Sequence, residues 1–532
     1  MRSSVLPPIV GRLFLAMARR RVEQWDRALD RLEETQLAEL RAICHHAAGT
    51  ELGRARGLAS VKTYRDFRQQ VPVGDYDTFS PAIERMRRGE KNILIPEFVE
   101  HFGNSSGSST QGKPKFLPIA DRQIKQQSGS GVDGLFRYLV HAGDADFTSG
   151  FTLGLFPPIT MRQEGPVKIT SNPALMAVKK PRISELVYLP RDRECLETTD
   201  YDRKLELIAE RYLDHDVRAV AGTTCWFSLL FDKLLTVAAR QGRRADSVSE
   251  IWPNLRVLLG GGVSAAPYLE VLRQRLGPNP ATLVDTYNAT EGGVYAATDH
   301  SGERGLLMIP DRGVFFEFVP VEEHDAVSPR RVPLWEVEVG RTYAIVVTTP
   351  SGLYAYKLGD LVRFTSKRPL RVEFVGRTLG CLSTTQELTT HAEIERAVAA
   401  ALVRHPAVAV DFAAGAEVGV GGTSRSRYVL FVEFNAGRAP ADLGGFARAF
   451  DEGLCQENRV YREHRTQDTA ILAPELVLLP AGSVRRFLSE VRGGNVQAKF
   501  PRVVEGDYQA ALRRYAAGPS AGSNGAVHVD AS

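Results

Sequence analysis

Apolar residues recur every three or four positions near the start of the chain, which is the spacing of the buried face of an amphipathic helix. The pattern runs through Val22, Trp25, Leu29, Leu32, Leu37 and Leu40. An earlier apolar stretch at 9–17 is interrupted by Arg12 and is too short and too charged to span a bilayer or to act as a signal peptide. We therefore predict that the chain begins with a helix that docks on the protein core, in preference to an interfacial membrane anchor.

The middle of the chain alternates short apolar runs with helical patterns. Residues 71–74 and the Gly/Ser-rich run 103–112 have the composition of loops, whereas 255–259 and 344–348 are predicted to be buried strands. Such alternation favours an α/β fold.

The pattern changes near residue 376, where a strand-like run at 372–375 ends in Gly376 and Arg377. A helical pattern with apolar residues at 394, 398 and 402 follows, then a strand at 428–434 and a further helix, which predicts a smaller α+β domain. We predict three parts: a large domain over 1–376, a small C-terminal domain over 377–515, and a disordered Gly/Ala/Ser-rich tail over 516–532.

The composition is that of an ordinary soluble globular protein, since 43% of the 532 residues are hydrophobic and 24% are charged. A net charge of +4, with both signs interspersed, gives no reason to expect a nucleic-acid partner, and no membrane partner is predicted. The cysteines lie far apart and form no C-x-x-C pair, which favours a reducing, cytoplasmic location. They are Cys44, Cys195, Cys225, Cys381 and Cys455.

The segment 104–115 concentrates hydroxyl groups, glycines and two lysines, with the sequence NSSGSSTQGKPK. Glycines let backbone N–H groups approach phosphate oxygens, hydroxyls donate further hydrogen bonds, and a lysine offsets negative charge, so the segment is a candidate polyphosphate-binding loop. Gly107, Gly112 and Lys113 also fit the P-loop pattern G-x-x-x-x-G-K, but Pro114 stands where a magnesium-binding hydroxyl is needed. A flexible Ser/Gly loop that binds nothing is the alternative.

Three later segments suit a nucleotide site, and purely structural turns are the alternative for the Tyr–Glu and Gly–Asp segments. A flat aromatic ring at Tyr287 can stack on adenine, and the glycines at 260–262 permit close backbone approach. Glu291 offers the hard oxygen that Mg²⁺ prefers. Asp360, which follows Gly359 in a predicted tight turn, can accept hydrogen bonds from ribose hydroxyls.

These segments occur in the order seen in adenylate-forming enzymes, and the chain more narrowly resembles the Gretchen Hagen Three family of acyl acid amido synthetases. The resemblance extends from about residue 37 to about residue 505 and includes the segment QAKFPR at 497–502. It implies a large N-terminal adenylate-forming domain with mixed β-sheets and flanking helices, and a smaller mobile C-terminal domain. It also implies that ATP and Mg²⁺ are used to activate a carboxylic acid as acyl-AMP, and that the acyl group passes to an amine or amino acid.

The resemblance implies roles for individual residues. Lys499 and Lys115 are the expected catalytic lysines, and Glu291 is the expected metal ligand. The expected nucleotide-binding residues are Ser105, Ser106, Gly107, Ser108, Ser109, Thr110, Gly112, Lys113, Gly261, Gly262, Tyr287, Asn288, Ala289, Thr290, Tyr356, Asp360 and Arg377. The expected acyl pocket includes Thr224, Trp226, Val263 and Ser264.

The sequence departs from the family pattern after Arg377, where a Gly-Glu-Lys stretch is usual and Thr385, Gln386 and Glu387 stand here. Two alternatives therefore stay open. One is the same adenylation with the thiol of coenzyme A as acceptor. The other is a catalytically idle homologue that binds a nucleotide or an acid.

Overall fold

A computed structural model describes most of the chain. The described residues are 6–105, 115–159, 161–179, 182–262, 265, 268–279, 281–324, 326–378, 382, 384, 389–418, 420, 425–465, 471–490, 499–517 and 526–527. The chain divides into two compact units, which we call the first and the second unit. The first comprises Met1–Tyr268 and Leu272–Phe374, and the second comprises Leu269–Val271 and Val375–Ser532.

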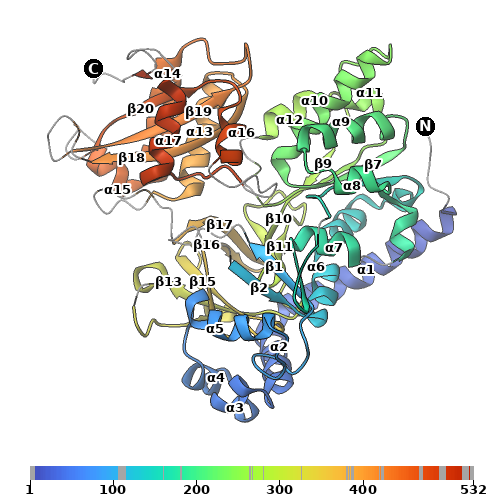
Figure 1. Ribbon diagram of the computed structural model, residues 1–532, viewed down its shortest axis with the longest axis vertical. Helices are drawn as coiled ribbons and strands as arrows, with labels where there is room; N and C mark the ends of the chain where they lie inside the picture. Colours follow the sequence, from blue (N-terminus) through green and yellow to red (C-terminus); the bar gives the residue numbers. More distant parts are fainter. Residues whose placement is uncertain are drawn as a thin grey trace. The chain divides into compact units, whose positions relative to one another are not determined.

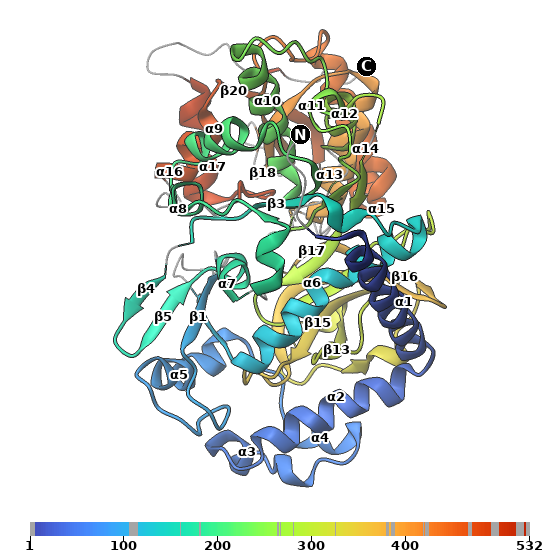
Figure 2. The ribbon, with the colours of Figure 1, turned by 90° about the vertical axis from the view of Figure 1, so that its right-hand side faces the viewer.

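Two helices open the first unit, α1 (Pro8–Asp30) and α2 (Leu32–Ala47), separated at Arg31. The predicted apolar face of α1 is buried, and its Trp25 indole donates a 2.6 Å hydrogen bond to the carbonyl oxygen of Met308. Figures 1 and 2 show α1 lying along α6 (Asp121–Ala142). The N-terminal helix therefore docks on the core, as its spacing predicts. Within the described part of the chain, no helix is both long enough and apolar enough to cross a membrane.

A five-stranded sheet of parallel strands lies in the first unit, with the order β6-β3-β7-β8-β9. Its strands are β3 (Phe151–Leu155), β6 (Tyr188–Leu189), β7 (Val217–Gly222), β8 (Val257–Leu259) and β9 (Thr282–Val284). The helices between them supply large apolar side chains to one shared core, as the short, fully apolar strand β8 predicts. These helices are α8 (Arg193–Glu197), α9 (Tyr201–Tyr212), α10 (Thr224–Arg240), α11 (Val248–Ile251) and α12 (Leu269–Leu276). Helix α7 (Asn172–Lys179) instead places Leu175 in a smaller cluster with Ile119 and Ile124.

An eight-stranded sheet has the order β10-β11-β12-β17-β16-β15-β13-β14. Its strands are β10 (Thr286–Ala289), β11 (Gly293–Ala297), β12 (Leu306–Met308), β13 (Phe315–Pro320), β14 (Val332–Pro333), β15 (Thr342–Thr348), β16 (Tyr356–Lys367) and β17 (Leu370–Arg377). The predicted strand 344–348 lies within β15. Figure 1 shows β10 and β11 close to the neighbouring strand β1.

A four-stranded sheet carries the candidate phosphate loop between β1 (His101–Ser105) and β2 (Lys115–Ile119), which pair in antiparallel fashion. β5 (Val167–Thr170) and β4 (Arg162–Glu164) complete the sheet. The prediction of a loop from residue 103 is wrong for its first three residues, because 103–105 pair with 115–117 of β2. Three short helices lie earlier in the chain: α3 (Glu51–Ala55), α4 (Tyr64–Gln70) and α5 (Tyr76–Arg87).

The second unit is built on a sheet with the order β18-β19-β20-β21. Its strands are β18 (Ala409–Val418), β19 (Ser426–Phe434), β20 (Ile471–Leu479) and β21 (Ala526–Val527). Alternate residues of β19 enter two separate cores, one with α13 and α14 and the other with α16 and α17. The helices are α13 (His391–Arg404), α14 (Leu443–Glu457), α15 (Arg459–Arg465), α16 (Ser483–Glu490) and α17 (Gly506–Ala517). Most of the tail predicted over 516–532 lies outside the described residues.

Candidate functional site

The first unit brings the candidate adenine-binding and ribose-binding residues into direct contact. The hydroxyl of Tyr287 on β10 donates a 2.8 Å hydrogen bond to Oδ2 of Asp360 on β16. Both side chains are buried, and the Tyr287 ring packs against Tyr295 and Phe374 at centroid distances of 5.5 and 5.8 Å. Two residues 73 positions apart in the sequence therefore meet at one place.

The candidate glycines lie against the same strand, β10. A Cβ atom on Gly261 would lie 2.5 Å from Oγ1 of Thr286 and 2.9 Å from Nδ2 of Asn288, so only glycine fits here. Oγ1 of Thr286 in turn donates to the carbonyl oxygen of Gly260 at 2.9 Å. Gly262 follows with a φ of +79°, which glycine adopts readily. The segment therefore packs tightly on β10, and its close approach to a nucleotide stays a prediction.

The first candidate acyl-pocket residue adjoins these glycines. Thr224 is buried at the start of α10, and its Oγ1 accepts a 3.2 Å hydrogen bond from the Gly261 N–H. Trp226 lies two residues further along α10 and packs against the hydrophobic core of the parallel sheet. Val263 and Ser264 lie outside the described residues.

Thr290 lies beside the strand that leads into the candidate phosphate loop. A Cβ atom on Gly103 of β1 would lie 2.7 Å from Cγ2 of Thr290, so β1 and the turn after β10 pack closely. The pairing of Ser105 with Lys115 fixes both ends of the loop side by side. The loop residues Ser106, Gly107, Ser108, Ser109, Thr110, Gly112 and Lys113 lie outside the described residues.

Lys115, at the far end of that loop, is half-buried, and its Nζ lies 5.6 Å from the centroid of the Tyr76 ring. The Tyr76 hydroxyl accepts a 3.0 Å hydrogen bond from the Phe116 N–H. Tyr76 therefore fixes the start of β2 from the side of α5.

Negative charge gathers around one buried hydroxyl. Burial, together with the carboxylates of Glu291 and Asp360 and the phenol of Tyr356, raises the pKa of Tyr295 well above its usual value. Glu291 and Asp360 therefore both disfavour a negative charge on the Tyr295 phenol. A cation bound between nucleotide phosphates and Glu291 would lower the repulsion between the phosphates and this carboxylate. Across the described ranges, no group of three or more His, Cys, Asp or Glu residues could hold a metal ion. Mg²⁺ that travels with a nucleotide needs only one or two protein carboxylates, so this donor set fits it.

Tyr356, the last candidate in the first unit, is buried at the start of β16 and contacts the Phe79 ring at 5.9 Å. Backbone hydrogen bonds of 3.0 and 2.7 Å connect Gly74 to Ala355 and Lys357. Residues 71–74, predicted to be a loop, therefore brace the strand that carries Asp360.

Arg377 and Lys499 belong to the second unit and are both exposed. Arg377 ends β17, and Lys499 directly precedes the buried Phe500. Two residues after Phe500, the carbonyl oxygen of Arg502 accepts a 2.8 Å hydrogen bond from Ala414 N–H on β18. The segment that carries Lys499 is therefore fixed to the sheet of this unit. Thr385, Gln386 and Glu387 lie outside the described residues.

Some features of the structure were missed or misjudged from sequence. Gln123 and Gln127 on α6 contact Thr290, and the only sequence signal for them is a pair of polar residues four positions apart in a helix. Nothing in the sequence singled out Cys44 as a core residue, yet its side chain is buried in α2.

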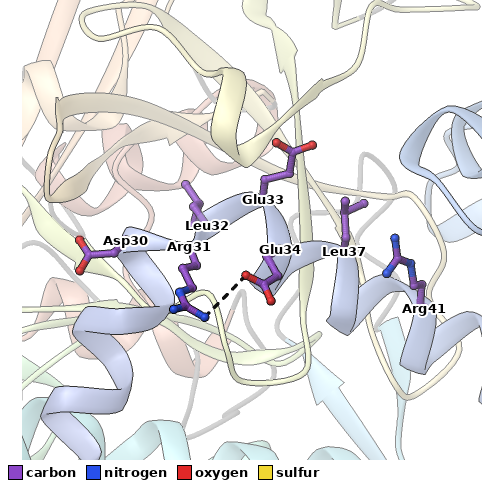
Figure 3. A pocket seen from close by; sticks show the side chains of 7 residues that line it. All are labelled: Asp30, Arg31, Leu32, Glu33, Glu34, Leu37 and Arg41. Atoms are coloured by element: carbon purple, nitrogen blue, oxygen red, sulfur yellow. Dashed lines mark ion pairs between the residues drawn. The ribbon is translucent and has the colours of Figure 1, made fainter.

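A surface hollow lies at the junction of α1 and α2, and none of the residues that line it is a candidate site residue (Figure 3). Arg31 and Glu34 form a 4.0 Å ion pair there, and both are largely exposed. Such an exposed ion pair contributes little, and the hollow adds nothing to the site.

Comparisons with known proteins find relatives along the whole chain. A rice protein (Oryza sativa subsp. indica) named indole-3-acetic acid-amido synthetase GH3.8 is 26% identical over 91% of this chain and 89% of its own length. A Nicotiana attenuata protein named jasmonoyl--L-amino acid synthetase JAR4 is 24% identical over 87% and 90%.

Solved structures show the same fold. AtGH3.15 acyl acid amido synthetase in complex with 2,4-DB superposes with a TM-score of 0.74 at 19% identity, covering 96% of this chain and 97% of that protein. A 2-hydroxyisobutyryl-CoA ligase in a postadenylation state gives a TM-score of 0.59 at 14% identity, over 91% and 92% of the two chains.

Three family models match successive parts of the chain. They are the GH3 family N-terminal domain at 21–149, the central domain at 307–377 and the C-terminal domain at 392–507. Since the three ranges together take in more than half of the residues and occur in the order of their names, the chain belongs to the GH3 family.

Proposed function

We propose that this protein is an ATP-dependent acid-amido ligase. A carboxylate oxygen of the acid attacks the α-phosphorus of ATP, forming acyl-AMP and releasing pyrophosphate. The nitrogen of an amine, in our proposal an amino acid, then attacks the acyl carbon and loses a proton, and AMP leaves. The observation that carries the proposal is the convergence of Tyr287, Asp360 and Gly261 on β10 in a chain whose relatives are named amido synthetases.

The residues of the first unit have complementary tasks in this proposal. Tyr287 offers its ring to adenine, and the Asp360 carboxylate accepts hydrogen bonds from the ribose hydroxyls. The backbone at Gly261 and Gly262 bounds the nucleotide, and the acid lies toward Thr224. The loop between β1 and β2 receives the phosphates, where N–H groups, hydroxyls and Lys113 balance their charge.

The nucleotide is bound as its magnesium complex in this proposal, with Glu291 as the protein ligand. When bound, the metal ion lowers the charge repulsion between the attacking carboxylate and the triphosphate. Lys115 and Lys499 add positive charge where the pentavalent phosphorus develops.

We assign nucleotide and acid binding to the domain over 1–376 and Lys499 to the small domain over 377–515. Closure of the small domain would exclude water from the mixed anhydride, whose hydrolysis would waste ATP. We place the reaction in the cytoplasm, with small molecules as partners and neither nucleic acid nor membrane. The free thiols of Cys44, Cys195 and Cys455 agree with a reducing compartment.

The decisive test is acid-dependent exchange of labelled pyrophosphate into ATP, measured over a panel of aromatic, alicyclic and fatty acids. We expect exchange with at least one class of acid. Lys499→Ala should slow that exchange about 100-fold while ATP binding changes little, because its charge acts mainly in the transition state. The exposed Lys367 at the end of β16 provides a matched control, and Lys367→Ala should exchange at the wild-type rate.

Two results would contradict the proposal at different levels. Equal exchange in wild type and Lys499→Ala would remove the role of Lys499. An absence of acid-dependent exchange across the whole panel would favour an idle nucleotide-binding homologue instead.

A further inference from the structure

Helix α6 buries a row of polar side chains where an apolar stripe is usual. Gln123, Gln127, Ser130 and Gly134 follow one another at four-, three- and four-residue spacing, so they share one face of the helix. Gln123 and Ser130 are at most 1% exposed, and Gln127 is 4% exposed. This face packs along β11 (Figure 1), next to the turn that contains Glu291.

The row of polar groups matches the backbone of that turn. Nε2 of Gln123 donates a 3.0 Å hydrogen bond to the carbonyl oxygen of Thr290, and Nε2 of Gln127 approaches the same oxygen at 3.5 Å. Ser130 Oγ accepts a 3.4 Å hydrogen bond from the Val294 N–H at the other end of the turn. The peptide group that joins Thr290 to Glu291 is therefore held by side chains of α6.

The close approach depends on a glycine. Gly293 has a φ of +101°, and a Cβ atom at this position would lie 2.6 Å from Cγ of Gln127. On its other side, the turn contacts β1 through Thr290 and Gly103. The turn therefore packs against both β1, which leads into the candidate phosphate loop, and α6, which follows β2.

Packing alone does not account for the two glutamines. Among the described residues, Oε1 of Gln123 and Oε1 of Gln127 are buried with no hydrogen-bond partner. A buried acceptor without a partner opposes folding, and side chains such as Met would fill the same volume without that penalty. What Met lacks is the N–H donor to Thr290.

We propose that Gln123 and Gln127 are positioning residues that fix the turn between Thr290 and Gly292, so that the Glu291 carboxylate faces the metal ion of a bound magnesium nucleotide. The inference rests on the proposed function, and it extends that function to residues on α6 that touch neither nucleotide nor acid. Gln123, which makes the shorter bond, has the larger effect.

Calorimetric titration with ATP, once with excess Mg²⁺ and once with EDTA, tests the inference without turnover. The measured quantity is the dissociation constant of ATP in EDTA divided by the dissociation constant with Mg²⁺. This ratio reports how much the metal strengthens nucleotide binding. We expect Gln123→Met to lower this ratio about 5- to 10-fold, because loss of one hydrogen bond lets the Glu291 turn shift. Gln127→Met should lower it less.

Gln126 provides a matched control on the same helix. Its Oε1 is also buried with no partner among the described residues, but its side chain lies against Gly313 and makes no bond to Thr290. Gln126→Met should keep the wild-type ratio. Thermal unfolding of each variant separates positioning from folding, since a purely structural role would lower Tm without changing the ratio.

A folded Gln123→Met protein with the wild-type ratio would overturn the inference. If Gln123→Met does not fold, Gln127→Met becomes the test variant, and an unchanged ratio in that protein would also overturn the inference. Failure of the proposed function looks different, because wild-type protein would then show no acid-dependent pyrophosphate exchange whatever its metal dependence.

Discussion

At the scale of single residues, the hydrogen bond from Tyr287 to Asp360 determines how the carboxylate is presented. Its Oδ2 is occupied by the phenol, and the side chain is 3% exposed, so its orientation is restricted. We predict that Tyr287→Phe weakens ATP binding about 5-fold, which is the effect of losing one hydrogen bond. Without that bond, the Asp360 carboxylate must become ordered when the nucleotide binds. The dissociation constant of ATP, measured by calorimetry, checks this.

A second Tyr–Asp pair offers the control. In the second unit, the buried Tyr461 donates a 2.8 Å hydrogen bond to Asp451, and neither of the two is a candidate nucleotide residue. Tyr461→Phe should cost stability comparable to Tyr287→Phe and leave ATP binding unchanged. Equal ATP affinity in Tyr287→Phe and wild type would show that the phenol does not orient Asp360.

Residue chemistry made part of this site predictable. An aromatic ring and a carboxylate suit a nucleoside, and the resemblance implies nucleotide-binding roles for Tyr287 and Asp360, which the structure places in contact. Gln123 and Gln127 could not be found in this way, because glutamine is an ordinary helix residue. Their significance depends on a carbonyl oxygen 167 and 163 positions away.

At the scale of elements, one arginine anchors the segment that carries Lys499. Nε of Arg502 donates to Glu395 on α13 at 2.9 Å, Nη1 donates to Asp411 on β18 at 2.5 Å, and the guanidinium lies 4.2 Å from the centroid of the Phe412 ring. Arg502 and Glu395 are 7% and 5% exposed. The segment after Lys499 is therefore tied to a helix and a strand of the second unit at once.

We predict that Arg502→Met lowers the free energy of unfolding by about 3–5 kcal/mol, because the buried Glu395 and the partly buried Asp411 lose their cation. Urea unfolding measures this change. Arg513→Met is the control, since Arg513 pairs with Glu475 and Glu417 but does not contact the Lys499 segment. Per folded molecule, only Arg502→Met should also slow pyrophosphate exchange, and an unchanged rate would argue that the anchor has no part in placing Lys499.

Elements with strong local periodicity were predictable. The apolar spacing at 394, 398 and 402 lies in α13, and the strand predicted at 428–434 lies in β19. Elements that depend on distant partners were not predictable. Residues 103–105 carry Gly, Asn and Ser, yet they belong to β1 because β2 pairs with all three and β5 pairs with Gly103. The break at Arg31 between α1 and α2 has no glycine or proline to mark it.

At the scale of the whole molecule, the candidate residues are shared between two compact units. The boundary between the two units lies between Phe374 and Val375, close to the change of sequence pattern near residue 376. Tyr287, Asp360 and Glu291 fall in the first unit, whereas Arg377 and Lys499 fall in the second. The identity of the acid could not be predicted, because the candidate pocket residues lie in segments far apart in sequence, such as those of Thr224 and Ser264.

The acceptor of the acyl group is decided by the chemistry of the second half-reaction. An amine nitrogen forms an amide that resists hydrolysis, whereas the thiol of coenzyme A forms a thioester that hydroxylamine cleaves. We predict that incubation with ATP, Mg²⁺, the preferred acid and a mixture of the twenty common amino acids gives a product whose mass is the sum of acid and amino acid minus water. AMP should form in equal amount, because each adenylate is used once.

The same incubation with coenzyme A in place of amino acids is the control, and it should give AMP only at the slow rate at which water attacks the adenylate. A hydroxylamine-sensitive product from coenzyme A, with no amide from any amino acid, would assign this chain to thioester formation. The proposal for the first half-reaction would be unaffected by that outcome, because the roles that we propose for Tyr287, Asp360 and Glu291 belong to adenylation, whichever nucleophile follows.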